Sequence, residues 1–185
     1  MGCDIHVYRE KFSNEPDYGR LDKAQRRDLT LDIIDGDITF DYRWISADKW
    51  ELETYGNQED EDYEAYWYTI ERRICGYDGR NYQFFNILAG GVRGDENDES
   101  VISIPKGVDP SASKPYLEEV NDMSGDGHSH SYLTLKELKE HLPKLKNREI
   151  LCLVNYELLI EDLEKLNKEN GGNPEHVRIC FFFDN

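Results

Sequence analysis

The two ends of the chain constrain its fold more than any other segment. Residues 3–8 alternate between apolar and polar side chains, which places Asp4 and His6 on one face of the segment and the apolar residues on the other. A period of two is typical of a half-buried β-strand. Residues 177–183 form a strongly apolar run that also predicts a strand. The sequence therefore predicts a sheet to which both ends of the chain contribute.

Helices are predicted in the second half of the chain, where apolar residues recur at helical spacing. One helix covers residues 82–89 and is followed by two glycines. A second begins near Thr134, because Thr134 and Glu137 have the spacing of a capping box, and it ends before Pro143. A third covers residues 155–170. These helices supply most of the apolar surface that a sheet can bury.

The remaining segments carry weaker patterns. Alternation and aromatic residues favour strands, whereas prolines without periodicity favour a loop. The resulting predictions are a charged helix over 17–29, a strand over 38–44, a short helix from Ser46 to Trp50, an acidic loop over 58–64, a strand over 65–74 and a loop over 94–116.

The chain has 185 residues, which suits a single domain. It contains no internal repeat, no low-complexity tract and no break in composition. We predict one α+β domain over residues 1–185, with a largely antiparallel or mixed sheet and about four helices packed on it.

The strong negative charge limits the partners of the protein. The chain has 39 acidic and 22 basic residues, which gives a formal net charge of −17. A field of this sign repels nucleic-acid phosphates unless basic residues are concentrated in a groove. Binding of DNA or RNA is therefore disfavoured. High solubility is the common use of such acidity, and imitation of a nucleic-acid surface is the alternative.

The sequence also predicts a cytoplasmic protein without a membrane partner. No apolar run approaches the ~18 residues of a membrane span, and the first residues lack the basic and apolar regions of a secretion signal. No C-x-x-C pair is present, so neither a zinc knuckle nor a disulfide framework is indicated. The widely spaced cysteines are expected to be reduced thiols, with Cys3 buried and inert; they are Cys3, Cys75, Cys152 and Cys180.

The segment over 126–131, DGHSHS, has the densest group of chemically active side chains. Asp126, His128 and His130 can each bind a metal ion or a proton. We expect the segment to be a loop directly before the capped helix, where side chains and free backbone N–H groups can face an anion such as phosphate. The alternative is that both histidines are turn residues that bond only to the backbone.

Asp4 and His6 form a second group, because a pair at i and i+2 on one strand can supply two ligands to a metal ion or a histidine oriented by a carboxylate. We expect Asp4, His6 and His128 to converge in one pocket, with Asp126 or Asp184 nearby. Such a site suits zinc or manganese and could activate water for hydrolysis. A metal-free alternative uses His6 and His128 as paired acid and base.

Basic residues near the helix over 82–89 are candidates for binding phosphate, although surface ion pairs would explain them equally well. Tyr82 is one of several aromatic residues that could stack on a base. The candidate residues are, for catalysis, His6, His128 and Asp126; for substrate binding, Arg80, Asn81, Tyr82, Arg93, Ser129 and His130; and for a divalent metal, Asp4, His6 and His128.

Four segments together resemble a family of small, uncharacterised phage and prophage proteins. They are the opening MGCDIH, RNY with the following FFNILAGGVR, DGHSHSYLTLKEL, and the ending FFFDN, about a third of the chain in all. YLTL stands where the family pattern has WLTL, which leaves the histidines unchanged. The resemblance implies a protein made in the cytoplasm of an infected bacterium. It supplies no reaction, but by analogy with small acidic phage proteins it suggests action against a nucleotide immune signal.

Three functions follow from these observations. The first, which we prefer, is a hydrolase, such as a phosphodiesterase, that acts on a nucleotide-like small molecule. The second is a sponge that sequesters the same nucleotide without cleaving it, for which a homo-oligomer is expected because pockets often form between subunits. The third is an acidic DNA mimic, which needs no histidine. The first two use the same residue types, so the sequence does not separate them.

Overall fold

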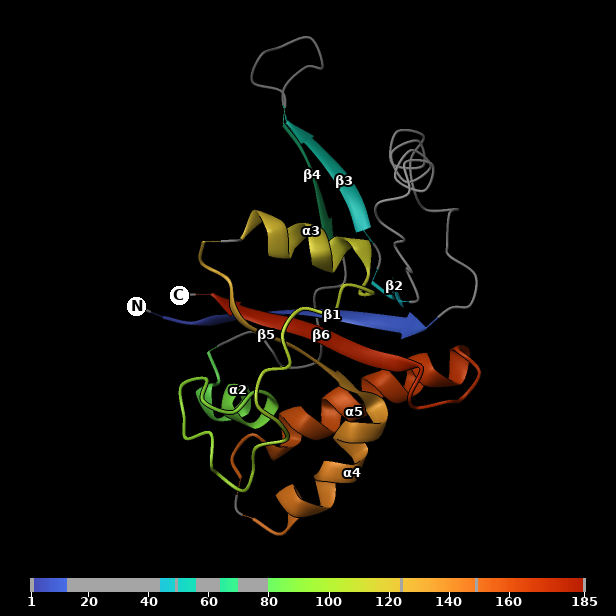
Figure 1. The fold of residues 1–185 in the computed structure, drawn as a ribbon. Coiled ribbons are helices and arrows are strands. Elements are labelled where there is room, and N and C mark those ends of the chain that lie inside the picture. The colour runs from blue at the N-terminus through green and yellow to red at the C-terminus, as the bar shows by residue number, and fades with distance from the viewer. Residues whose placement is uncertain are drawn as a thin grey trace.

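The fold is built around a four-stranded sheet in which every neighbouring pair is antiparallel (Figure 1). The computed structural model describes residues 2–12, 44–48, 50–55, 64–69, 80–123, 125–148 and 150–184. The strand order is β2-β1-β6-β5, so both end segments of the chain lie in the middle of the sheet. These strands are β1 (Asp4–Phe12), β2 (Trp44–Ser46), β5 (His128–Thr134) and β6 (Val177–Asp184).

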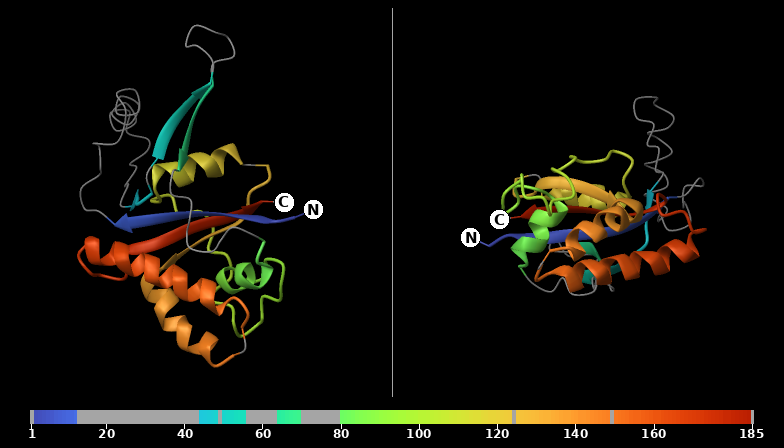
Figure 2. Two further views of the ribbon diagram at one scale, coloured as in Figure 1. Left: turned by 180° about the vertical axis from the view of Figure 1, so that it is seen from behind. Right: turned by 90° about the horizontal axis from the view of Figure 1, so that it is seen from below.

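Four helices and a separate hairpin complete the described part of the chain. In Figures 1 and 2, α3 lies on one side of the four-stranded sheet and α2, α4 and α5 lie on the other, while the hairpin of β3 and β4 projects past α3. The bounds are β3 (Trp50–Tyr55), β4 (Glu64–Thr69), α2 (Tyr82–Leu88), α3 (Lys114–Asp122), α4 (Leu135–Lys146) and α5 (Leu153–Glu169). The predicted α+β class is confirmed.

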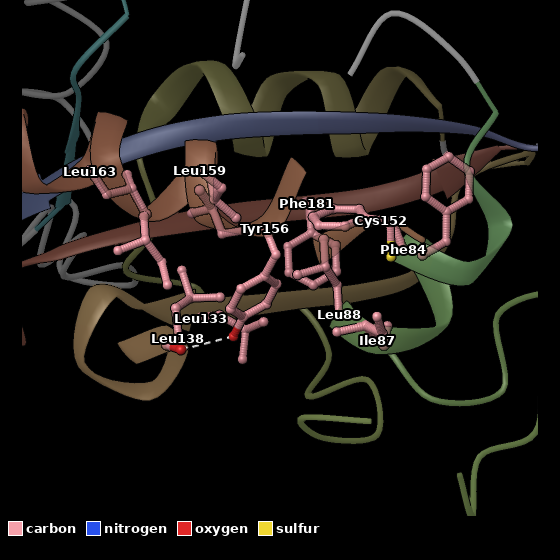
Figure 3. Close-up of a cluster of buried hydrophobic side chains, with 14 of the residues drawn as sticks. Phe84, Ile87, Leu88, Leu133, Leu138, Cys152, Tyr156, Leu159, Leu163 and Phe181 are labelled. Carbon is pink, nitrogen blue, oxygen red and sulfur yellow. Dashed lines mark hydrogen bonds between the residues drawn. The ribbon is translucent and has the colours of Figure 1, made fainter. Parts of the chain in front are cut away.

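The main apolar core lies between the sheet and α2, α4 and α5 (Figure 3). Phe181 and Phe183 of β6 point into this core from alternate positions, and both belong to the same cluster as Leu159 and Leu163 of α5, all four with no exposed surface. Burying a side chain of this size contributes roughly 1.5–3 kcal/mol. The polar end of buried Tyr156 is satisfied because its hydroxyl donates to the Leu138 carbonyl at 2.9 Å. This core holds α4 and α5 on the sheet.

The predicted capping box forms at the start of α4. Thr134 Oγ1 accepts from the Glu137 backbone N–H at 3.2 Å, and the Glu137 carboxylate accepts from the Thr134 backbone N–H at 2.8 Å. The prediction that this helix ends before Pro143 is wrong, since α4 continues to Lys146. Leu145, beyond the proline, is fully buried. Its packing therefore compensates for the backbone hydrogen bond that proline cannot make.

Three other predictions are corrected by the structure. The predicted helix from Ser46 to Trp50 is absent, because Ser46 ends β2, Trp50 begins β3, and Ser46 Oγ accepts from the Asp48 backbone N–H at 3.2 Å. The predicted loop over 94–116 ends early, because α3 begins at Lys114 with a proline in its first turn, a position where proline is tolerated. Residues 128–131 are not a loop but the first part of β5.

Other predictions are confirmed or fall outside the described residues. The helices over 82–89 and 155–170 correspond to α2 and α5, and the strand over 65–74 is confirmed as far as Thr69. The predictions for 17–29, for 38–43, for most of 58–64 and for Cys75 lie outside the described residues. In the part of the chain that the structure describes, no helix has the length and apolarity needed to cross a membrane.

Candidate active site

Asp4 and Arg80 form an exposed ion pair where β1 begins and the chain approaches α2. The Asp4 carboxylate accepts from Arg80 Nε at 3.1 Å and from Arg80 Nη2 at 3.2 Å. These hydrogen bonds lower the pKa of Asp4. The Asp4 backbone N–H donates to Asp184 Oδ1 at 3.1 Å, which connects the pair to the end of β6. Arg80 is thus already at this end of the sheet, bound to a carboxylate.

His6 lies next to this pair and contacts two carboxylates. Its Nδ1 is 2.8 Å from Glu119 Oε1 of α3, and its Nε2 is 3.3 Å from Asp184 Oδ2 of β6. Burial alone would lower the pKa of His6, but the hydrogen bonds and charges of Glu119 and Asp184 outweigh it, so the pKa is raised above its usual value. This environment favours the imidazolium form of His6.

Phe182 lies between His6 and a second histidine, His130. Because β1 and β5 flank β6, the two imidazole rings approach Phe182 from opposite sides. The His6 ring stacks on Phe182 at 4.5 Å between centroids and 5° between planes, and the His130 ring lies at 5.2 Å and 36°. We call His6, Phe182 and His130 the histidine row. It lies on the α3 face of the sheet, where Glu119 also reaches His6.

His130 has the opposite electrostatic environment to His6. Burial lowers the pKa of His130; a hydrogen bond to the Gly127 backbone opposes this shift, and neighbouring His128 adds to it. Its Nδ1 is buried and has no hydrogen-bond partner among the described residues. The neutral form of His130 is therefore favoured. The two ends of the histidine row favour different protonation states.

His128 lies on the other face of the sheet from His6. Its ring faces Phe183 at 6.1 Å between centroids, whereas His6 stacks on Phe182. Phe182 and Phe183 are consecutive residues of one strand, so their side chains point to opposite faces. The structure therefore does not bring Asp4, His6 and His128 together in the predicted pocket. His128 Nδ1 contacts Ser129 Oγ at 3.0 Å instead.

The other predicted substrate-binding residues near α2 have structural contacts. Asn81 caps α2, since its Oδ1 accepts from the Phe84 backbone N–H at 3.1 Å. Tyr82 packs edge-on against Phe85, and the Arg93 guanidinium lies 5.7 Å from the Tyr82 ring centroid. These contacts account for the local positions of all three predicted residues without a ligand.

Asp126 and Cys3 are also placed by the structure. Asp126 is exposed in the turn before β5, where its backbone N–H donates to the Met123 carbonyl at 3.0 Å. Cys3 is fully buried, and burial raises its pKa although Arg93 lowers it. This agrees with the prediction of a buried thiol. The predicted residues that gather at the histidine row are thus Asp4, His6, Arg80 and His130.

The predicted metal ligands do not form a suitable coordination group. Across the described ranges, no three His, Cys, Asp or Glu side chains are arranged to hold a metal ion. Asp4 is instead bound by Arg80, and His128 is separated from His6 by the sheet. The structure therefore does not place Asp4, His6 and His128 as ligands of one metal ion.

Sequence reasoning missed Glu119 and Phe182, which shape the surroundings of His6. Glu119 was missed because the predicted loop over 94–116 covered the start of α3, and no element was predicted over the rest of this helix. Phe182 was counted only as part of an apolar strand.

Comparison of the chain with models of protein families, with curated proteins and with solved structures found no match.

Proposed function

We propose that the protein is a metal-independent hydrolase that cleaves a phosphoester bond in a nucleotide-like small molecule. The observation that supports this proposal is the histidine row, in which two histidines contact one phenylalanine and have pKa values shifted in opposite directions. Environments that separate the pKa values of two nearby groups are typical of acid and base pairs in enzymes. The pair is His6 and His130, in place of the pair His6 and His128 considered from sequence.

His6 is the general acid in this proposal. Glu119 and Asp184 favour its protonated form, so a proton is available for the leaving group. Asp184 Oδ2 is the more distant of the two carboxylate contacts, at 3.3 Å from His6 Nε2. A leaving-group oxygen that replaces Asp184 at Nε2 would receive the proton as the phosphorus–oxygen bond breaks. Glu119 then serves as a positioning residue, because it holds the other ring nitrogen.

His130 is the general base. Its lowered pKa keeps a nitrogen lone pair free near neutral pH. It accepts one proton from a water molecule as the water oxygen bonds to phosphorus. The leaving oxygen takes the proton of His6, so a phosphodiester and water become a phosphomonoester and an alcohol. His130 then releases its proton to solvent and His6 takes one up from solvent, which returns both histidines to their starting states. Paired acid and base catalysis of this kind typically contributes ~10²-fold to 10⁴-fold per group.

Arg80 is the phosphate-binding residue. Its guanidinium is about half exposed, with a side-chain exposure of 53%, and it already binds the planar Asp4 carboxylate through two nitrogens. Like the Asp4 carboxylate, a phosphate group presents two oxygens that can accept from both guanidinium nitrogens, and it carries more negative charge. We therefore expect a phosphate to displace Asp4 from Arg80 and to lie between Arg80 and His6.

The resemblance to phage proteins supports the substrate class and the cellular setting. A protein made in the cytoplasm of an infected bacterium would gain from destroying a nucleotide signal of host immunity. We propose such a signal as the substrate and a counter-defence role for the protein. Its net charge of −17 disfavours long nucleic acids as substrates and is compatible with a small ligand bound at a local arginine.

The test is incubation of the purified protein with cyclic and linear nucleotides in excess EDTA, followed by chromatography before and after heat denaturation. A new product with wild type, and its loss in His6→Gln and His130→Asn, would support the proposal. His176→Asn is the matched control, because His176 packs on Phe12 at the other end of β1. Intact nucleotide released only by heat would overturn hydrolysis in favour of a sponge.

A further inference from the structure

The strand that carries His128 and His130 has an irregular register. His128 pairs with Phe183 and Ser131 pairs with Phe181, so the two residues between them on β5 lie opposite the single residue Phe182. This is a β-bulge, which inserts one extra residue into one strand of an antiparallel pair. In a regular strand, His128 and His130 would point to the same face. Here they contact Phe183 and Phe182, which lie on opposite faces.

Ser129 supplies the backbone conformation of this bulge. Its φ of 53° lies in the left-handed region, which residues other than glycine rarely adopt. The Ser129 side chain remains close to His128, with 3.0 Å between Oγ and Nδ1. Strained backbone of this type persists only where its surroundings require it.

A second segment holds the bulge from the outer edge of the sheet. The Gly107 backbone N–H donates to the His130 carbonyl at 2.8 Å, and the Lys106 backbone N–H donates to Ser131 Oγ at 3.2 Å. Both contacts lie directly after Ser129, so they hold the backbone of His130 and the side chain of Ser131 in place. The position of His130 is therefore set from two sides, by β6 and by residues 106–107.

We infer that Ser129 is a positioning residue, whose bulge turns His130 onto the α3 face so that it lies across Phe182 from His6. A catalytic role for His130 in this position depends on the proposed function, whereas the position of its side chain on the α3 face does not. A side chain branched at Cβ disfavours positive φ, so valine at 129 resists the bulge and displaces His130. Glycine accepts positive φ without strain and preserves it.

Deletion of Ser129 gives an independent expectation. Removing the extra residue leaves His128 opposite Phe183 and His130 opposite Phe182 in a regular strand. The two histidines then become consecutive residues and still point to opposite faces. Deletion should therefore be tolerated better than substitution by valine, which is the reverse of the usual order for a strand residue.

The test is titration of the histidine ring signals by NMR in wild type, Ser129→Gly, Ser129→Val and the Ser129 deletion, together with the hydrolysis assay. We expect glycine and the deletion to retain the lowered pKa of His130 and hydrolysis within a few-fold of wild type. We expect valine to return the pKa of His130 toward the ordinary ~6.5 and to reduce hydrolysis by ~10²-fold. The signal of His141, which is buried in α4, serves as an internal control for folding.

Each outcome decides the inference. If valine leaves the pKa of His130 unchanged in a folded protein, or if the deletion raises it to the ordinary value, the inference is overturned. If the valine variant does not fold, the glycine and deletion variants still decide. If the titrations follow our expectation but wild type hydrolyses nothing, the proposed function fails while the placement of His130 by Ser129 stands.

Discussion

The two faces of the four-stranded sheet are both buried, but they are buried in different ways. The face under α2, α4 and α5 is mainly apolar, with Phe181 and Phe183 in its centre. It also holds ion pairs that join Arg9 of β1 to Asp48 and to Asp162 of α5. The face under α3 contains a smaller apolar cluster around Phe182 and a series of buried or half-buried charges. Apolar packing tolerates small shifts, whereas ion pairs and hydrogen bonds require particular geometries. We infer that the first face supplies most of the stability and that the second fixes the positions of His6 and His130, the proposed acid and base.

Arg178 shows how far the α3 face relies on buried charge. Its side chain is 2% exposed, and its Nε donates to Glu10 Oε2 at 2.7 Å. Its Nη1 donates to Asp109 Oδ2, and its guanidinium lies 3.9 Å from the Trp44 ring centroid. Glu10 also accepts from the Ser113 backbone N–H at the start of α3, at 2.7 Å. This network attaches one end of α3 to the sheet, as Glu119 and His6 attach the other.

The largest expected effect comes from breaking this network on one side. Arg178→Met removes the partner of buried Glu10 and should reduce the free energy of unfolding by about 3–5 kcal/mol. The double variant Arg178→Met with Glu10→Gln should recover part of this loss, because the buried charge of Glu10 is then removed as well. Denaturation by guanidinium chloride measures both. A loss below about 1 kcal/mol for the single variant would contradict the importance of the buried ions.

Consecutive phenylalanines offer a matched pair that compares the two faces directly. Phe181→Leu and Phe182→Leu should each reduce the free energy of unfolding by about 0.5–3 kcal/mol, since both side chains are fully buried. Only Phe182→Leu should change the pKa values of His6 and His130 and the hydrolysis rate. Equal changes in histidine titration for the two variants would show that the faces do not differ in the way we describe.

The pH dependence of stability should reveal the ion pairs of His6. The pKa of His6 is raised in the folded state, so its protonation stabilises the fold fully below the unfolded pKa of about 6.5. This contribution is lost as pH rises through the folded pKa. The melting temperature of His6→Gln relative to wild type should therefore be lowest at acid pH, and the difference should shrink above neutrality. His130 and His141, with lowered pKa values, act in the opposite direction but are present in both proteins.

The smallest effect on stability is expected at the exposed pair of Asp4 and Arg80. Solvent screens this pair, so Asp4→Asn and Arg80→Ala should leave the melting temperature unchanged. Their effects on phosphate binding should be opposite: Asp4→Asn strengthens inhibition of hydrolysis by inorganic phosphate, and Arg80→Ala removes it. If both variants bind phosphate as wild type does, Arg80 has no role in binding.

The sequence was sufficient for elements whose signals are local. The alternation at 3–8, the apolar run at 177–183 and the capping box at Thr134 each depend on neighbouring residues, and each corresponds to an observed element. Asp4 and His6 were correctly placed on one face for the same reason. Local patterns of this kind directly reflect the periods of strands and helices.

The remaining parts of the site depend on contacts between distant residues. Glu119 reaches His6 across 113 positions of sequence, and α3 was obscured by prolines that occupy permitted positions. The bulge at Ser129 changes which histidine faces His6, yet serine carries no sequence signal for a positive φ. One extra residue in a strand reverses the faces of all residues before it. Because the sequence predicted a loop over 126–131, it gave no basis for choosing His130 over His128 as the neighbour of His6.

The measurement that tests the central claim most directly is an NMR titration of all five histidines in the wild-type protein. The claim is that the α3 face holds His6 and His130 in different protonation states on either side of Phe182. We predict that the pKa of His6 lies above about 6.5 and that the pKa of His130 lies below it, so that near neutral pH one ring is charged and the other is not. Coincident titration of His6 and His130 near the ordinary value would contradict the account.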